Sequence, residues 1–203
     1  MKIVEVFASV QGEGLRQGLP TLFVRLAGCN LRCRFCDTQK AWRGGRPKTE
    51  ASLLKRLDAL RRRDPAAWVC LTGGEPLLQD LGGLVAGLHA RGFKVQLETN
   101  GTLFQPAPFD WVALSPKPPA YFSHPRWRAS AKEVKIVVSR DLTYAAIEKL
   151  RGEFPVRTPI LLQPQSNRAE SRAKALRLFR DSARAGLPNI RLTLQLHKIY
   201  KIK

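Results

Sequence analysis

Short β-branched segments alternate with amphipathic segments along most of the chain, and this alternation constrains the fold more than any other feature. Strands are predicted at 21–26, 68–71, 93–97, 111–114, 133–138, 160–162 and 190–196, and helices at 49–63 and 77–91, after Asp141, and from Asn167 to near Gly186. Strand-then-helix repeats favour a parallel sheet with helical crossovers. A chain of 203 residues is shorter than the roughly 250 residues of a complete eight-unit barrel. We therefore predict a single α/β domain, residues 1–203, built as a partial, open β/α barrel with a mostly parallel sheet.

Polar clusters follow the predicted strands directly. They are Cys29–Cys36, Thr72–Pro76, Glu98–Gly101, Ser115–Lys117 and Gln163–Ser166. Loops that follow parallel strands emerge on one face of such a barrel, and that face holds the active site. We expect these five clusters to converge, although they are far apart in sequence.

Local signals predict where several helices begin and end. Thr49 and Asp141 are predicted N-caps, and Asn167 with Glu170 three residues later has the spacing of a capping box. Gly92 is placed as the residue that ends the helix at 77–91. The Pro-, Lys- and Arg-rich stretch 116–130 is predicted to be irregular.

Three cysteines with C-x3-C-x2-C spacing, Cys29, Cys33 and Cys36, lie on one short loop. Electron-transfer clusters use four cysteine ligands. Three ligands leave one metal position open, which is what a metal needs to bind and activate a small molecule. A structural zinc site with His197 or Cys70 as the fourth ligand is the alternative. Cys70 lies in an apolar strand, which favours its interpretation as a buried core thiol.

Charge and hydropathy limit the classes of partner. The formal net charge of +19 favours anionic partners but does not choose among them. No apolar run approaches the roughly 20 residues of a membrane-spanning helix, and the N-terminus lacks a signal-peptide pattern, so we expect a cytoplasmic protein. The arginine-rich helix near residues 168–184 is interpreted as a solvated surface rather than a nucleic-acid site.

The cysteine loop and the segment Gly73-Gly74-Glu75-Pro76 together resemble the radical S-adenosylmethionine superfamily. A further set of motifs, in order along the chain, resembles the 7-carboxy-7-deazaguanine synthase family within it: Gln11-Gly12-Glu13-Gly14, Cys36-Asp37-Thr38, Leu97 to Thr102, Ser115-Pro116-Lys117, Gln163-Pro164 and Gln195-x-His197-Lys198. The resemblance runs from about Val6 to Lys203.

This resemblance implies a radical enzyme that uses a 4Fe-4S cluster, S-adenosylmethionine and Mg²⁺. It implies hydrogen abstraction by a 5′-deoxyadenosyl radical and ring contraction of 6-carboxy-5,6,7,8-tetrahydropterin. The product is 7-carboxy-7-deazaguanine, made with loss of ammonia on the route to queuosine and related deazapurines. It also implies a flavodoxin- or ferredoxin-like electron donor and a homodimer.

The resemblance carries residue roles onto matching positions. Cys29, Cys33 and Cys36 would hold the cluster, and Thr38 would contact Mg²⁺. Contacts to S-adenosylmethionine are expected from Phe35, Cys36, Asp37, Gly74, Ser115, Pro116, Lys117, Gln163, Pro164, Gln165 and Ser166. Substrate contacts are expected from Val10, Gln11, Gly12, Arg25, Thr72, Glu98, His197 and Lys203. Only Arg25 has a separate physical argument, because a guanidinium can hold a carboxylate through two parallel hydrogen bonds. Its alternative is a solvated charge at a strand end.

Two competing functions stay open on sequence alone. Another small radical enzyme, such as an activase acting on a glycine of a partner protein, would share the cysteine loop but would not need Gln11–Gly14 or His197-Lys198. A basic zinc protein that binds nucleic acid is the second alternative.

Overall fold

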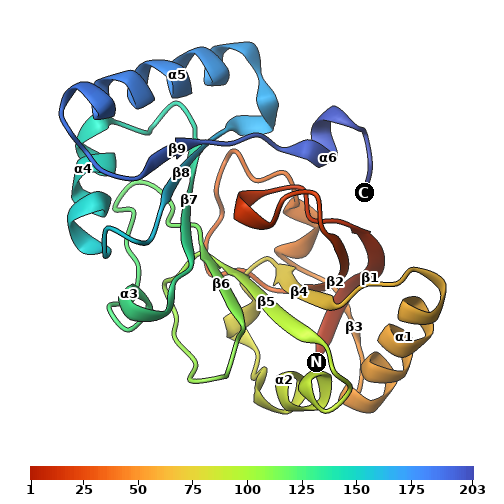
Figure 1. The fold of residues 1–203 in the computed structure, drawn as a ribbon. Coiled ribbons are helices and arrows are strands. Elements are labelled where there is room, and N and C mark those ends of the chain that lie inside the picture. Colours follow the sequence, from red (N-terminus) through yellow and green to blue (C-terminus); the bar gives the residue numbers. More distant parts are fainter. The chain divides into compact units, whose positions relative to one another are not determined.

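The computed structural model describes all residues 1–203, which form two compact units. Unit 1 comprises residues 1–11, 18–99 and 103–112, and unit 2 comprises residues 12–17, 100–102 and 113–203. Figure 1 labels their helices and strands. The prediction of a single domain stays a prediction. No helix combines the length and the apolar character needed to cross a membrane.

Unit 1 is built on a five-stranded sheet in the order β3-β1-β2-β4-β5. Its strands are β1 (Lys2–Val10), β2 (Pro20–Leu26), β3 (Arg46–Pro47), β4 (Trp68–Gly73) and β5 (Lys94–Thr99). β2, β4 and β5 run parallel, whereas β1 is antiparallel to both β2 and β3. The carboxyl ends of the three parallel strands therefore share one edge of the sheet. Neither β1 nor β3 is among the strands predicted from the sequence.

Two helices cover one face of this sheet, α1 (Glu50–Arg63) and α2 (Gly82–His89). They lie next to each other at the bottom of Figure 1. The Thr49 side chain accepts a hydrogen bond from the backbone N–H of Ser52, 3.2 Å away, so its predicted role as N-cap is confirmed. Leucines spaced at helical intervals along α1 are buried against the sheet, which is the packing that their periodicity predicts.

The helix predicted at 77–91 is observed only over Gly82–His89. The chain forms a short 3-10 helix, η3 (Pro76–Leu78), and α2 begins only at Gly82. Gln105 explains the delay, because its amide group donates to the carbonyls of Leu77 and Gln79 at 3.0 and 2.8 Å. Those carbonyls would otherwise accept bonds within a longer helix.

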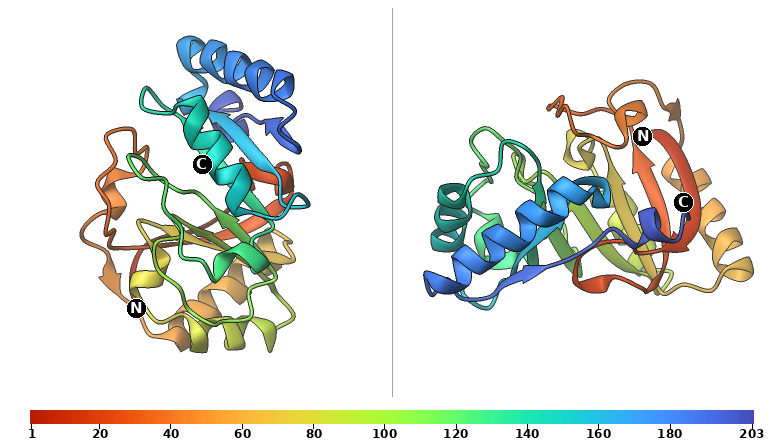
Figure 2. Two further views of the ribbon diagram at one scale, coloured as in Figure 1. Left: turned by 90° about the vertical axis from the view of Figure 1, so that its left-hand side faces the viewer. Right: turned by 90° about the horizontal axis from the view of Figure 1, so that it is seen from above.

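Unit 2 contains parallel strands in the order β6-β7-β8-β9. They are β6 (Trp111–Leu114, which begins in unit 1), β7 (Glu133–Val138), β8 (Ile160–Pro164) and β9 (Ile190–Leu192). α4 (Tyr144–Glu153) and α5 (Ala169–Arg184) pack against each other and against this sheet, as Figure 2 shows. Two one-turn helices complete the unit, α3 (Trp127–Ser130) inside the stretch predicted to be irregular, and α6 (Leu196–Ile199).

Three boundary predictions in unit 2 are wrong. α4 is capped by Thr143, whose side chain accepts from the N–H of Ala146 at 3.3 Å, rather than by Asp141. α5 has no side-chain cap, because the Asn167 side chain instead bonds the backbone N–H and carbonyl of Gln195 at 3.1 and 2.9 Å. β9 also ends at Leu192 instead of continuing to residue 196.

Candidate active site

The three cysteines of the motif lie on the loop that follows β2 in unit 1. None of the three cysteines forms a disulfide and all three are half-buried. The N–H of Cys36 donates to the carbonyl of Cys33 at 3.0 Å, which folds the loop into a turn. Burial raises the pKa of the Cys29 thiol, and the nearby charges of Glu75 and the other two cysteines raise it further. A metal centre with positive charge would reverse that effect, because bound thiolates are stabilised by the metal. Three accessible thiols on one loop fit the 4Fe-4S cluster of the resemblance.

The Gly-Gly-Glu-Pro segment packs directly on the start of the cysteine loop. A Cβ atom added to Gly74 would lie 2.1 Å from the carbonyl oxygen of Gly28 and 2.8 Å from the Cβ of Cys29, so only glycine fits there. The N–H of Glu75 donates to the same Gly28 carbonyl at 2.8 Å. The fully buried Glu75 carboxylate accepts from the Thr99 hydroxyl at 2.7 Å. The ends of β2, β4 and β5 are therefore joined around this loop.

A row of polar residues crosses four neighbouring strands of unit 1. Glu5 of β1 is paired with Arg25 of β2, and Arg25 is in register with Thr72 of β4. Leu71 of β4 is paired with Leu97 of β5. The next residues in the same register are Thr72 and Glu98, which therefore lie beside each other. Laterally aligned residues share a face of a sheet. Three residues expected to contact substrate, Arg25, Thr72 and Glu98, therefore stand side by side.

Arg25 is oriented by groups from both sides. Its Nε donates to the Glu5 carboxylate at 2.8 Å, and its guanidinium lies 5.9 Å from the centre of the Phe7 ring. The Lys40 ammonium lies 3.1 Å from the same Glu5 oxygen. The bond to Glu5 uses Nε, and the Nη groups of the same guanidinium are suited to donate to a second carboxylate.

Gln11, directly after β1, reaches the same face. It is 3% exposed, and its Nε2 lies 3.3 Å from the Glu98 carboxylate and 3.9 Å from the Cys70 sulfur. Gln96 also donates to Glu98, at 2.7 Å. Cys70 is buried and forms no disulfide, which agrees with its interpretation as a core thiol. Amide and carboxylate groups held in this way can recognise the hydrogen-bonding edge of a heterocycle. Val10, the last residue of β1, is half-buried.

The residues after Cys36 carry oxygen ligands. The Thr38 hydroxyl donates to the Asp37 carboxylate at 3.1 Å, and Asp37 is exposed whereas Thr38 is half-buried. Hard cations such as Mg²⁺ prefer oxygen ligands of this kind. Phe35, within the cysteine loop, is half-buried.

Unit 2 contains a buried charge network that the sequence analysis did not assign. The Lys135 ammonium and the Gln195 amide each lie 2.6 Å from a different oxygen of the Glu13 carboxylate. Burial alone would raise the pKa of Glu13, but the Lys135 charge and the bond from Gln195 outweigh burial and lower this pKa to about 2. Glu13 is therefore a carboxylate at every physiological pH.

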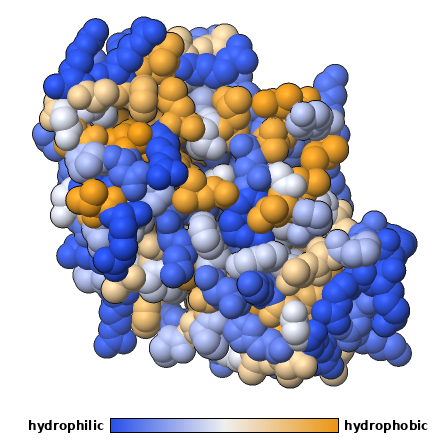
Figure 3. Space-filling view, viewed as in Figure 1, coloured by the Kyte–Doolittle hydropathy of each residue, from blue (hydrophilic) through white to orange (hydrophobic).

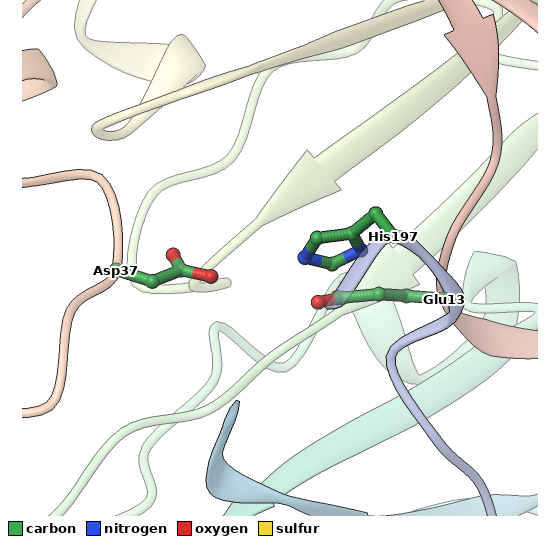
Figure 4. Close-up of side chains that lie close together, drawn as sticks. All are labelled: Glu13, Asp37 and His197. Carbon is green, nitrogen blue, oxygen red and sulfur yellow. The ribbon is translucent and has the colours of Figure 1, made fainter. Parts of the chain in front are cut away.

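His197 lies against this network, as Figure 4 shows for its ring and Glu13. A ring nitrogen of His197 and a Glu13 carboxylate oxygen are within 4.8 Å of each other. A Cβ atom on Gly12 would lie 2.4 Å from Nδ1 of His197, and the N–H of Leu196 donates to the Gly12 carbonyl at 2.9 Å. The segment 12–17 thus fixes the position of the C-terminal histidine. Lys203 is exposed at the end of the chain.

The remaining predicted residues of unit 2 lie at the carboxyl ends of the parallel strands β6 and β8, where Gln163 and Pro164 are the last two residues of β8. Lys117 donates to the hydroxyl of Ser115. The N–H of Gln165 donates to the Ser171 hydroxyl, which in turn donates to the Val138 carbonyl at the end of β7, at 2.7 and 2.6 Å. Ser166 has a φ of +50°, a left-handed conformation that gives the turn after β8 its shape. Gln163 is buried, and Pro116 and Pro164 are as well.

Glu5, Glu13 and Lys135 are the residues that sequence reasoning missed. Lys135 stands between apolar residues in a predicted strand, and a charge in such a position needs a buried partner. That signal indicated a pair, but the sequence alone could not identify Glu13, more than a hundred residues away, as the partner.

Comparison with known proteins agrees with this site. The model of the radical SAM superfamily matches residues 24–179, which include the cysteine loop. The chain belongs to the radical SAM superfamily.

More specific relatives are similar over nearly the whole chain. The 7-carboxy-7-deazaguanine synthase of Aquifex aeolicus is 38% identical over 98% of this chain and 93% of its own length. That of Burkholderia multivorans is 35% identical over 98% of both. The crystal structure of QueE from Escherichia coli superposes with a TM-score of 0.78, at 31% identity, covering 97% of this chain and 94% of that one. Within the superfamily, the chain is a 7-carboxy-7-deazaguanine synthase, and its fold is α/β with an open, mostly parallel sheet, as predicted.

Proposed function

We propose that the chain converts 6-carboxy-5,6,7,8-tetrahydropterin into 7-carboxy-7-deazaguanine, with loss of ammonia, through Cys29, Cys33 and Cys36 as the ligands of a 4Fe-4S cluster. The observation that carries the proposal is the loop of three half-buried cysteines, none of them in a disulfide, whose start packs against Gly74. When bound, the cluster and S-adenosylmethionine supply the one-electron chemistry that removes a hydrogen atom from the substrate.

The polar row in unit 1 is proposed to hold the substrate. The Nη groups of Arg25 bind the pterin carboxylate, while Glu5 fixes the guanidinium through Nε. Gln11 and Glu98, which are already bonded to each other, bind the nitrogen-bearing edge of the ring, and Thr72 contacts it from between them. Fixed partners of this kind orient the carbon that reacts, because little rearrangement is needed on binding. Val10 adds an apolar contact.

The other contacts are proposed from the motifs that match the family. Those to S-adenosylmethionine are assigned to Phe35, Cys36, Asp37, Gly74, Ser115–Lys117 and Gln163–Ser166. Thr38 contributes its hydroxyl oxygen to Mg²⁺, whose remaining ligands are water and substrate oxygens. Gly12, His197 and Lys203 are also proposed to contact the substrate, and the Glu13 network holds His197 in place.

A homodimer and a flavodoxin- or ferredoxin-like donor complete the proposal. β9 is the last strand of the unit 2 sheet. Exposed apolar side chains lie at its last residue, Leu192, and beyond it along the chain, at Leu194, Ile199 and Ile202. An apolar edge of this kind favours association with a second copy. Light scattering coupled to size-exclusion chromatography tests this, and a monomer at micromolar concentration contradicts it.

Anaerobic turnover tests the proposed reaction. Protein reconstituted with iron and sulfide is reduced with dithionite and incubated with S-adenosylmethionine, Mg²⁺ and the carboxylated pterin. We expect 7-carboxy-7-deazaguanine and ammonia in equal amounts, detected by mass spectrometry and an ammonia assay. Cleavage of S-adenosylmethionine without a deazaguanine product would favour the glycyl-radical activase. Protein that holds zinc but neither iron nor sulfide would favour the zinc protein.

A further inference from the structure

The segment of unit 2 that follows β9 is held by hydrogen bonds rather than by apolar packing. We call residues 194–200 the C-terminal segment; it includes α6. Within one copy of the chain no residue of α6 is buried, and Leu194, Ile199 and Tyr200 are 40%, 50% and 69% exposed. Figure 3 shows apolar side chains at the surface over α6, at the upper right. Gln195 is the one buried residue of the segment, so polar contacts fix its position.

Asn167 supplies two of these polar contacts. It is the last residue of η4 (Gln165–Asn167), the turn that follows β8. Its side-chain Nδ2 donates to the Gln195 carbonyl at 2.9 Å, and its Oδ1 accepts from the Gln195 N–H at 3.1 Å. Both the donor and the acceptor of the amide are therefore used on one backbone residue. This pair of bonds ties the C-terminal segment to the turn after β8.

The segment 12–17 holds the C-terminal segment from a second direction. The Gln17 amide donates to the Leu194 carbonyl at 2.8 Å, and the Gln195 side chain donates to the Glu13 carboxylate at 2.6 Å. Gln195 is therefore anchored twice, through its backbone on the turn after β8 and through its side chain on the buried charge network. The backbone anchor is the one that leads to the turn proposed to contact S-adenosylmethionine.

The backbone of this turn has an unfavourable shape. Ser166 and Asn167 follow each other with φ values of +50° and +52°. Left-handed conformations are costly for residues other than glycine, although asparagine tolerates them better than most. The side chain of Asn167 reaches Gln195 from this conformation, so the two bonds depend on the shape of the turn. Contacts that stabilise the turn therefore also stabilise the position of the C-terminal segment.

We propose that Asn167 is a positioning residue for substrate binding, an inference that rests on the proposed function. Gln165 and Ser166, proposed to contact S-adenosylmethionine, set the shape of the turn. Through Asn167 the turn holds Gln195, and Gln195 fixes the backbone next to the proposed substrate contact His197. Ordering these residues once serves both ligands, so the second ligand to bind loses less conformational entropy. Each ligand should therefore tighten the binding of the other, because such coupling is reciprocal.

Asn167→Gly and a matched control variant test the proposal. Glycine adopts the left-handed conformation readily, so Asn167→Gly permits the same turn and removes the side-chain bonds to Gln195. The control is Asn189→Gly. Asn189 is also left-handed, with a φ of +54°, is also half-buried, and donates to the carbonyls of Val156 and Arg157 at 2.9 and 3.4 Å. It lies just before β9, at the amino end of the parallel strands, whereas the turn follows the carboxyl end of β8.

The first measurement is the coupling between the two ligands. Enzyme reconstituted with iron and sulfide is kept anaerobic and without a reductant, so that S-adenosylmethionine is not cleaved. Calorimetry gives the Kd of 6-carboxy-5,6,7,8-tetrahydropterin with and without saturating S-adenosylmethionine. We expect S-adenosylmethionine to lower this Kd about fivefold or more in the wild type and in Asn189→Gly, and less than about twofold in Asn167→Gly. A merely structural weakening would raise both Kd values alike and leave their ratio unchanged.

Amide hydrogen exchange gives a second measurement, which needs neither the pterin nor turnover. In the wild type, S-adenosylmethionine alone should slow exchange in the C-terminal segment, because local opening of the segment becomes rarer. In Asn167→Gly, exchange in this segment should be faster than in the wild type and should not respond to S-adenosylmethionine. Asn189→Gly should behave like the wild type.

The contrary outcomes are distinct. A wild-type Kd ratio in Asn167→Gly, or an equal loss of the ratio in Asn189→Gly, would overturn the positioning role. A wild type in which neither the pterin Kd nor the exchange responds to S-adenosylmethionine would overturn it as well. A wild type that yields no deazaguanine after reduction would instead contradict the proposed function. In that case, exchange that responds to S-adenosylmethionine in the wild type but not in Asn167→Gly would still support the link from the turn to the C-terminal segment.

Discussion

Removing the buried cation of unit 2 should destabilise the protein in a pH-dependent way. In Lys135→Met, the Glu13 carboxylate keeps its burial and loses its ammonium partner, which is 4% exposed in the wild type. Folding lowers the pKa of Glu13 from 4.5 to about 2. One pKa unit corresponds to about 1.4 kcal/mol, so this shift stabilises the folded protein by about 3 kcal/mol at neutral pH. We expect a loss of about 3 kcal/mol in the free energy of unfolding by urea at pH 7, which agrees with other broken buried pairs.

The pH dependence follows from the direction of the pKa shift. A carboxylate whose pKa is lowered on folding stabilises the protein fully above its unfolded pKa, and this stabilisation is lost as the pH falls from about 5 towards 2. In Lys135→Met, burial dominates and the pKa of Glu13 rises, so acid neutralises the unpaired charge. The difference between variant and wild type should therefore shrink to less than about half at pH 3.

Two further variants serve as controls for the loss of stability in Lys135→Met. Lys132→Met, at an exposed position just before β7, should change stability by less than about 0.5 kcal/mol. The double variant Glu13→Gln with Lys135→Met should recover most of the loss, because no buried charge is left. Equal losses for Lys132→Met and Lys135→Met, or a loss that is the same at pH 7 and pH 3, would refute the reasoning.

The remaining predictions concern the site itself. Cys33→Ala should abolish cluster assembly, seen as loss of bound iron and of the visible absorbance, because an under-ligated cluster is labile; normal cleavage of S-adenosylmethionine by this variant would contradict the ligand assignment. Thr38→Ala should raise the Mg²⁺ concentration needed for half-maximal turnover at unchanged iron content, and an identical Mg²⁺ titration would argue against that role. Gly12→Ala, whose Cβ would lie 2.4 Å from Nδ1 of His197, should cost about 1–3 kcal/mol of stability and raise the KM for the pterin. Unchanged stability and KM would mean that His197 has room to move.

The sequence by itself determined the class of chemistry, which is that of a radical enzyme with a cysteine-bound cluster, and the alternation of strands and helices along the chain. Three cysteines at fixed spacing and a Gly-Gly-Glu-Pro segment are local patterns, which need no knowledge of distant contacts to be read. Helical periodicity placed α1 and its cap at Thr49, because the bond from Ser52 depends on residues three positions apart.

Only the tertiary structure decided which distant residues meet. The alignment of Glu5, Arg25, Thr72 and Glu98 depends on strand register, which is set by packing across the whole sheet and cannot be read from any single segment. The delayed start of α2 depends in the same way on Gln105, and the buried pairing of Lys135 spans most of the chain. Hydrogen bonds and ion pairs with far partners override local propensity because burial makes an unsatisfied polar group costly.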